Sequence, residues 1–130
     1  MSVRIAGYAA LFDIPDGARD TIRKGAFART LAENKPLPLY WQHKPEQRIG
    51  SVEAIAEDAR GLRVIARIDN PDSLALRMLL ERQVNGLSFG YRARGYRRLP
   101  EGRVLEDVEL FEISLVSHPL QPGARVHLIQ

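Results

Sequence analysis

Three side chains in this sequence are of the types that together activate a serine nucleophile: a hydroxyl, an imidazole and a carboxylate. They are Ser88 in Gly-Leu-Ser-Phe-Gly, His43 in Trp-Gln-His and Glu112 in Phe-Glu-Ile-Ser. A serine hydroxyl attacks a carbonyl group only when a base removes its proton, and a neutral imidazole does this near neutral pH. An ionised carboxylate holds the imidazole in the required tautomer. The set therefore predicts a serine hydrolase.

Each of these residues also has a plainer structural interpretation when it is taken alone. A strand serine is commonly structural, and a strand glutamate commonly pairs with an arginine. The segment 86–90 has the letters of the Gly-x-Ser-x-Gly nucleophile elbow, but that elbow turns into a helix, and here a strand pattern continues. His118 and His127 compete for the base role and fit loop and tail positions better. The oxyanion donors are expected in the loop 118–124, with no residue assigned.

Strand alternation places the serine and the glutamate on corresponding faces of two strands. In residues 86–98 and 108–117 the apolar side chains face one way, while Ser88 and Glu112 face the other way. The apolar sets are Leu87, Phe89, Tyr91 and Ala93 in the first strand, and Phe111, Ile113 and Leu115 in the second. If these sets fill the interior, Ser88 and Glu112 emerge on the outer surface. His43, at the end of an extended segment, is then placed to bridge them.

The rest of the chain contains short strands separated by turns, with two short helical segments. Further strands are expected at residues 3–12, 37–43, 48–57, 61–69 and 103–107. Helices are expected from Gly25 to Glu33 and for about three turns after a cap at Asn70 or Asp72. Without βαβ alternation, this pattern predicts one β-rich α+β domain over residues 1–130. Its expected form is a small closed or nearly closed, mostly antiparallel β-barrel with a few short surrounding helices.

Composition limits the class of protein to an ordinary globular one. The 130 residues are 45% hydrophobic and 27% charged. No apolar run approaches the roughly 20 residues of a membrane-spanning helix, and the N-terminus lacks a signal-peptide pattern, so no membrane partner is expected and a cytoplasmic location fits. Without cysteine there is no disulfide, thiolate zinc site or cysteine nucleophile. Three histidines without close pairing give no reason to expect a metal site, and no cofactor is expected.

Charge is nearly balanced overall but uneven along the chain. The net charge is +3, and the segment from Arg92 to Arg103 holds five arginines and a single acid, Glu101. A solvated face is the favoured interpretation, and a groove for an anionic partner is the alternative. A small nucleic-acid-binding barrel is a third hypothesis, for which strong salt dependence of binding would be required.

Several motifs, taken together and in order, resemble those of the caudovirus prohead serine proteases. These are the capsid-maturation enzymes of tailed phages and related gene transfer agents. The resemblance is carried by Gly7–Phe12, Arg23–Phe27, Trp41–His43, Ile49–Gly50, Asn85–Tyr91 and Leu110–Pro119. It implies a protease with His43 as general base and Ser88 as nucleophile. The family is similar to the herpesvirus assemblins, which share a β-barrel encased by helices and place the third triad member in a strand after the serine strand. Glu112 occupies that place, with a carboxylate instead of the assemblin histidine.

The same resemblance implies a substrate, a partner and a location. The substrate would be the scaffolding segment of the major capsid protein, and the protease itself, cleaved inside the assembling procapsid in the bacterial host cell. Assemblin-like enzymes dimerise, which makes a homodimer the expected assembly. Many family members carry a C-terminal extension, whereas this sequence stops soon after the Glu112 strand, which puts self-processing in question. The alternative is a catalytically silent module of the same fold that binds capsid or scaffold.

Overall fold

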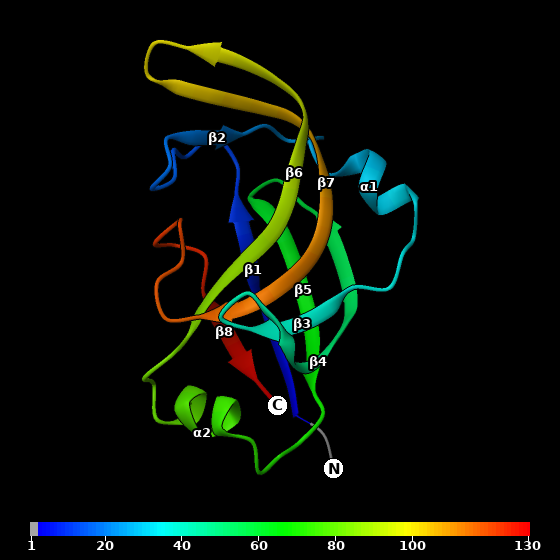
Figure 1. The fold of residues 1–130 in the computed structure, drawn as a ribbon, viewed down its shortest axis with the longest axis vertical. Coiled ribbons are helices and arrows are strands. Elements are labelled where there is room, and N and C mark those ends of the chain that lie inside the picture. Colours follow the sequence, from blue (N-terminus) through cyan, green and yellow to red (C-terminus); the bar gives the residue numbers. More distant parts are fainter. Residues whose placement is uncertain (1–2) are drawn as a thin grey trace.

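Eight strands and two short helices make up the computed structural model, which describes residues 3–130 (Figure 1). In chain order the elements are β1 (Val3–Leu11), β2 (Asp20–Ile22), α1 (Ala28–Ala32), β3 (Pro38–Trp41), β4 (Lys44–Glu57), β5 (Gly61–Ile68), α2 (Leu74–Leu80), β6 (Gly86–Leu99), β7 (Gly102–Val116) and β8 (Val126–Ile129). The β-rich class with few helices is therefore confirmed. Among the described residues, no helix has the length and apolar character needed to cross a bilayer.

All eight strands belong to one sheet, in the order β2-β7-β3-β4-β5-β1-β8, with β6 on β7. The pairs are antiparallel except for β2 and β3, which both run parallel to β7. The sheet is not closed into a barrel, so the predicted closure is not confirmed. A single bridge between Gly86 and Arg125 links the start of β6 to the segment before β8. The Leu87 N–H donates to Ala124 O beside this bridge.

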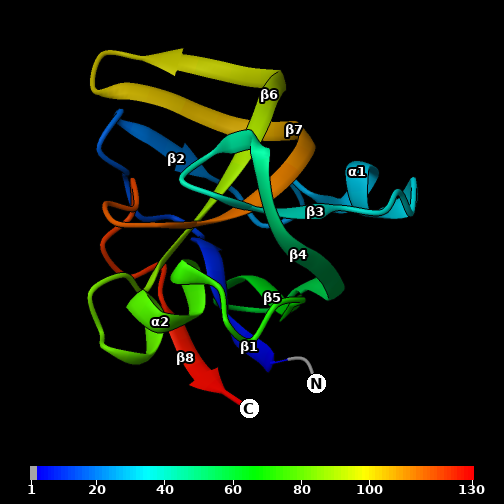
Figure 2. The same ribbon diagram turned by 60° about the horizontal axis from the view of Figure 1, so that its bottom comes forward.

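The long hairpin of β6 and β7 positions most of the candidate site. The tip of this hairpin projects beyond the body of the molecule, whereas α2, the start of β1 and the end of β8 lie at the opposite end (Figure 1). The second view agrees (Figure 2). As alternation predicts, Leu87 and Phe89 face the core, and Tyr91 and Ala93 pack against it.

The predicted face of the last strand is wrong at one residue. Residues 103–107 and 108–117 form a single strand, and its register with β6 passes from Gly90–Glu112 to Tyr91–Leu110. Phe111 is the extra residue of this β-bulge, and it is 51% exposed instead of packing with Ile113. A bulge shifts the alternation by one position, so that Leu110 and Ile113 both reach the core while Glu112 points to the other face.

Helix α1 supports this bulge. The Leu110 N–H lies between the part of β7 that pairs with β2 and the part that pairs with β3. It donates instead to the buried Thr30 Oγ1 of α1, at 3.1 Å. Because an unpaired buried N–H is costly, this contact removes the main penalty of the irregular backbone.

The other elements differ from expectation mainly at their ends. Strand β4 begins at Lys44 instead of residue 48, so β3 and β4 form a tight hairpin with His43 in its turn. Both helices are shorter than predicted, with five residues in α1 and seven in α2. The cap of α2 is Ser73, whose hydroxyl accepts from the Leu76 N–H, and not Asn70 or Asp72.

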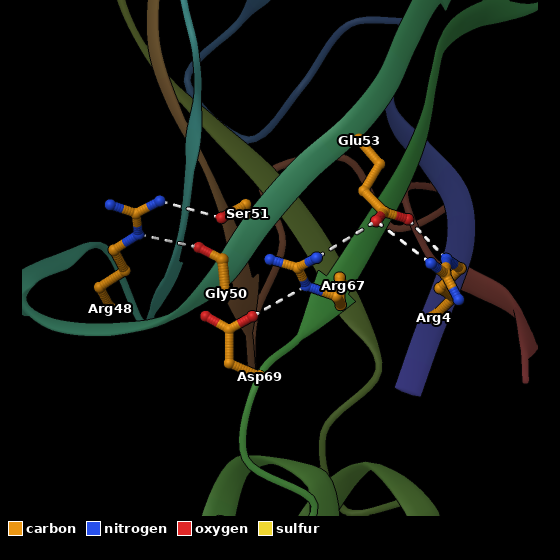
Figure 3. A network of polar contacts seen from close by, with 7 residues as sticks. All are labelled: Arg4, Arg48, Gly50, Ser51, Glu53, Arg67 and Asp69. Carbon is orange, nitrogen blue, oxygen red and sulfur yellow. Dashed lines mark hydrogen bonds and ion pairs between the residues drawn. The ribbon is translucent and has the colours of Figure 1, made fainter. Parts of the chain in front are cut away.

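Exposed ion pairs join side chains of β1, β4 and β5 (Figure 3). Glu53 of β4 accepts from Arg4 of β1 at 2.6 Å and lies 3.7 Å from Arg67 of β5, which also contacts Asp69. Such exposed pairs each contribute at most about 1 kcal/mol. They follow the strand register and do not determine it.

Candidate active site

His43 and Glu112 are in direct contact, as the sequence predicts. His43 Nδ1 lies 2.6 Å from Glu112 Oε1, although the residues are 69 positions apart in the chain. Parallel pairing of β3 with β7 produces this contact, because Trp41 lies opposite Leu115 and brings the β3–β4 turn beside the end of β7. The imidazole is 42% exposed, whereas the glutamate side chain is 9% exposed. A buried carboxylate therefore holds one nitrogen of an accessible ring.

A second serine, Ser114, completes the surroundings of the carboxylate. Its hydroxyl donates to Glu112 Oε2 at 2.6 Å and accepts from the His43 backbone N–H at 3.2 Å. Since Ser114 occupies Oε2, the Oε1 atom is left for the imidazole. Ser114 is completely buried. The glutamate is thus fixed at both oxygens, and this fixes the acceptor for the histidine N–H.

Ser88 lies on the strand next to this pair and on the same face. It is the cross-strand partner of Ser114 in the β6–β7 ladder. Directly opposed residues have Cβ atoms about 5 Å apart. No hydrogen bond joins the Ser88 hydroxyl to His43 or to another residue of the described range 3–130, and Ser88 is 5% exposed. The predicted position on an open outer surface is therefore wrong for both Ser88 and Glu112, because the loop after β7 and the β3–β4 hairpin border this end of the sheet.

The glycine at position 90 makes room for the glutamate. Gly90 lies opposite Glu112 in the ladder, and a Cβ atom built on it would clash with Glu112 Oε1 and lie 2.8 Å from its carboxyl carbon. The missing side chain therefore allows the carboxylate to lie across β6, beside Ser88. In the sequence, Gly90 belongs to the elbow-like pattern and to the family motif Asn85–Tyr91, and neither assigns it this role.

The remaining predicted site residues do not join this cluster. His127 packs its ring edge against Tyr8, with centroids 6.2 Å apart. Of the three histidines, all within the described residues, only His43 is hydrogen-bonded to Glu112. Pro119 of the loop 118–124 packs over Gly86, the first residue of the serine strand, but no oxyanion donor is identified. No group of three or more potential metal ligands occurs within residues 3–130.

A different ionic cluster lies at the other end of β7. Asp20 of β2 is 3% exposed, accepts two hydrogen bonds from the Arg103 guanidinium at 2.8 and 2.9 Å, and accepts a third from the Tyr91 hydroxyl at 3.0 Å. The Arg103 hydrogen bonds lower the pKa of the Asp20 carboxyl, with Tyr91 adding to this effect against the cost of burial. Burial, followed by the hydrogen bond to Asp20, raises the pKa of Tyr91 to about 12.

Comparisons with known proteins find relatives in phages and herpesviruses. The prohead protease of Enterobacteria phage HK97 is 30% identical over 128 residues, which is 92% of this chain and 57% of that protein. The capsid scaffolding protein of Suid herpesvirus 1 is 32% identical over 123 residues, which cover 93% of this chain and 22% of that protein. The chain thus spans little more than half of the HK97 relative.

Solved structures with low sequence identity share the fold. The varicella-zoster virus protease superposes with a TM-score of 0.69 at 18% identity, covering 100% of this chain and 64% of that one. The bacteriophage T4 capsid assembly protease gives 0.71 at 10% identity, with 87% and 80% covered. The family model described as caudovirus prohead serine protease matches residues 1–130. On this match over its whole length, the chain belongs to the caudovirus prohead serine protease family.

Proposed function

We propose that this chain is a serine endopeptidase of capsid maturation, with Ser88 as nucleophile, His43 as general base and Glu112 as the residue that orients the base. The observation that carries the proposal is the 2.6 Å contact between His43 Nδ1 and Glu112 Oε1, next to the strand of Ser88. With Nδ1 donating to the carboxylate, the Nε2 atom has the lone pair that a general base needs. Family membership supports the same roles.

The chemistry follows the general scheme for acyl transfer to serine. Ser88 Oγ forms a bond to the scissile carbonyl carbon while its proton passes to His43 Nε2, and Glu112 stabilises the resulting imidazolium. The tetrahedral intermediate collapses when the C–N bond breaks and the proton moves from Nε2 to the leaving amine. Water then attacks the acyl-enzyme with the same base, which releases the carboxylate product and restores the serine. Backbone N–H groups of the loop 118–124 are the proposed oxyanion donors.

The proposed substrate is the scaffolding segment of a major capsid protein, and the proposed site of action is the assembling procapsid. The relatives supply the support: one is a prohead protease, and others are a capsid polyprotein and a capsid scaffolding protein. Self-cleavage and a homodimer belong to the same proposal. A sedimentation experiment on the purified protein tests the dimer.

Co-expression of this chain with its cognate capsid protein tests the function. Intact-mass analysis is expected to show a shortened capsid protein with the native enzyme and the full-length one with Ser88→Ala or His43→Ala. Ser51→Ala, on β4, is the matched control, because its hydroxyl contacts only the exposed Arg48. Normal processing by either Ser88→Ala or His43→Ala would refute the assignment, whereas an uncleaved capsid protein with the native chain would favour the silent assembly module.

A further inference from the structure

The base of the proposed active site lies in an energetically unfavourable turn. Trp41 pairs with Lys44, so Gln42 and His43 are the two central residues of a tight hairpin turn. Both have positive φ, of 54° and 61°, in the left-handed region. Such turns are usually made by asparagine, aspartate or glycine, and each strained residue costs about 1–3 kcal/mol. Contacts elsewhere must therefore hold the turn in this form.

The Gln42 side chain makes the contacts that hold it. Gln42 Nε2 donates to Ser117 Oγ at 2.6 Å, and the Ser117 N–H donates back to Gln42 Oε1 at 3.0 Å. The Gln42 backbone N–H also donates to Leu115 O at 2.9 Å. Three hydrogen bonds thus join one turn residue to the end of β7. The carboxamide suits this arrangement because it has a donor and an acceptor, both of which are used.

The hydrogen bonds between Gln42 and Ser117, here called the clamp, join the same two segments as the contact between His43 and Glu112. Ser117 follows directly after the strand that carries Glu112, and His43 directly follows Gln42. Fixing Gln42 to Ser117 therefore sets where the His43 ring lies relative to the carboxylate. Beside it, the His43 backbone N–H donates to Ser114 Oγ at 3.2 Å, which is a longer bond than the one from Gln42 Nε2.

We propose that Gln42 is a positioning residue of this site: its carboxamide, clamped to Ser117, keeps the His43 imidazole on Glu112 and directed at Ser88. This inference rests on the proposed function for its effect on activity, and on the structure alone for the position of the ring. Misplacing a catalytic group by about 1 Å reduces the rate by roughly 100-fold. A clamp with only a structural role would change stability and leave the reactivity of the folded protein unaltered.

The key variant is Gln42→Asn. Asparagine adopts positive φ more readily than glutamine and keeps the amide, but it is one methylene too short to reach Ser117. Glu46→Ala is the control, since Glu46 is an exposed residue of the same hairpin. Ser117→Ala removes one of the two side-chain contacts and keeps the N–H donor, whereas Ser117→Thr keeps both. Each variant is compared at a temperature at which circular dichroism shows it to be folded.

Two measurements distinguish the position of the His43 ring from the reactivity of Ser88. The first is the second-order rate of labelling of Ser88 by a fluorophosphonate, in which a Ser88 Oγ–P bond forms, the P–F bond breaks, and the proton passes to His43. The second is the downfield proton signal of His43 Nδ1–H in protein labelled with 15N-histidine, assigned by its loss in Glu112→Gln. We expect Gln42→Asn to lower the labelling rate by 10- to 100-fold and to broaden or remove the signal. Ser117→Ala should have a smaller effect, and Ser117→Thr and Glu46→Ala almost none.

The outcomes distinguish this inference from the proposed function. If Gln42→Asn retains both the native labelling rate and the native proton signal, the positioning role is overturned while the catalytic assignment stands. If the native protein shows the proton signal but is never labelled at Ser88, the catalytic assignment fails. Loss of the signal in Gln42→Asn would then still support the clamp, and its retention would overturn it.

Discussion

Strand β7 has a contact between a carboxylate and a side-chain nitrogen near each of its ends, and the two contacts serve different purposes. At one end Asp20 binds Arg103, and at the other Glu112 binds His43. In both places a short strand pairs in parallel with β7 and brings the partner residue from far away in the sequence. The backbone arrangement is the same, so the difference in role must come from the side chains.

In the Asp20 cluster, both the arginine and the tyrosine are hydrogen-bonded to the carboxylate. Arginine stays charged under all ordinary conditions and binds the carboxylate through two nitrogens, while the Tyr91 hydroxyl binds Oδ2 as well. The Glu112 cluster instead leaves one imidazole nitrogen for a further partner, on a ring that is 42% exposed. An imidazole can accept and return a proton near neutral pH, which a guanidinium cannot. The first pair therefore stabilises the fold, and the second is suited to catalysis.

Replacing the carboxylate of the catalytic pair should have the largest effect. Glu112→Gln keeps the shape of the side chain, but its amide nitrogen can donate to His43 Nδ1 and so favour the wrong tautomer. We expect activity to fall by about 10⁴-fold, as for other carboxylate-to-amide changes in such triads. Intact-mass assays of capsid-protein cleavage over a long time course would measure this loss. A decrease of less than tenfold would remove Glu112 from the catalytic set.

Replacing the carboxylate at the other end of β7, that of Asp20, should lower the stability of the fold and not the activity. Asp20→Asn leaves the partly buried Arg103 without its counter-charge, and breaking such a pair costs about 3 kcal/mol, at the lower end of the usual range because Arg103 is 32% exposed. Urea denaturation would measure the free energy of unfolding. Activity of the folded variant should stay within about twofold of the native value. A large loss of activity at full folding would mean that the two ends of β7 are coupled.

The pH dependence of that stability difference follows from the lowered pKa of Asp20. The carboxyl has an ordinary value of 3.8 and a lower one in the folded protein. Its contribution is therefore complete above pH 3.8 and is lost as the pH falls through the folded value. Protonated Asp20 resembles asparagine, so native protein and Asp20→Asn should converge in unfolding free energy between pH 4 and the folded pKa. A constant difference over that range would contradict the assigned cause.

Two glycines of β6 allow a comparison in which the expected effect is smaller and depends only on the space around each position. Gly90→Ala places a methyl group against the Glu112 carboxylate, and we expect labelling of Ser88 by a fluorophosphonate to slow by roughly 10- to 100-fold. Gly95→Ala, on the same strand, meets no atom closer than 3.4 Å and is the control. Gly95→Ala should change the unfolding free energy by no more than about 1 kcal/mol, and the labelling rates are compared at a temperature at which circular dichroism shows both variants to be folded. Equal labelling rates for the two variants would show that the space at position 90 is not needed.

Sequence alternation predicted the serine strand well and failed at one residue of the glutamate strand, Phe111. Leu87 and Phe89 face the core as predicted, because β6 is regular from Gly86 to Gly90. The bulge at Phe111 has no clear local signal, since no glycine marks it and its support comes from Thr30, 80 residues away from Leu110. Glu112 was assigned to the correct face because Ile113 and Leu115 do face the core, and only Phe111 was assigned wrongly.

The turn that carries His43 was also missed, for a related reason. Hairpin turns of two residues are recognised by asparagine or glycine, and Gln-His has neither. The contacts that stabilise the turn come from Ser117 and Leu115 on another strand, which no local pattern reveals. The same applies to Ser114: its place two residues after Glu112 puts both on one face, but only the fold shows that it contacts both members of the pair. Residue types identified the chemistry, and tertiary contacts determine its geometry.

The most direct test is to find which atom of the folded protein a fluorophosphonate modifies. Native protein and His43→Ala would be treated in parallel, digested and mapped by mass spectrometry. A single adduct on Ser88 in the native protein, formed at least about 1,000-fold more slowly in His43→Ala, is the expected result. An adduct on another residue, or equal labelling of Ser88 in both proteins, would contradict a catalytic unit made of Ser88, His43 and Glu112.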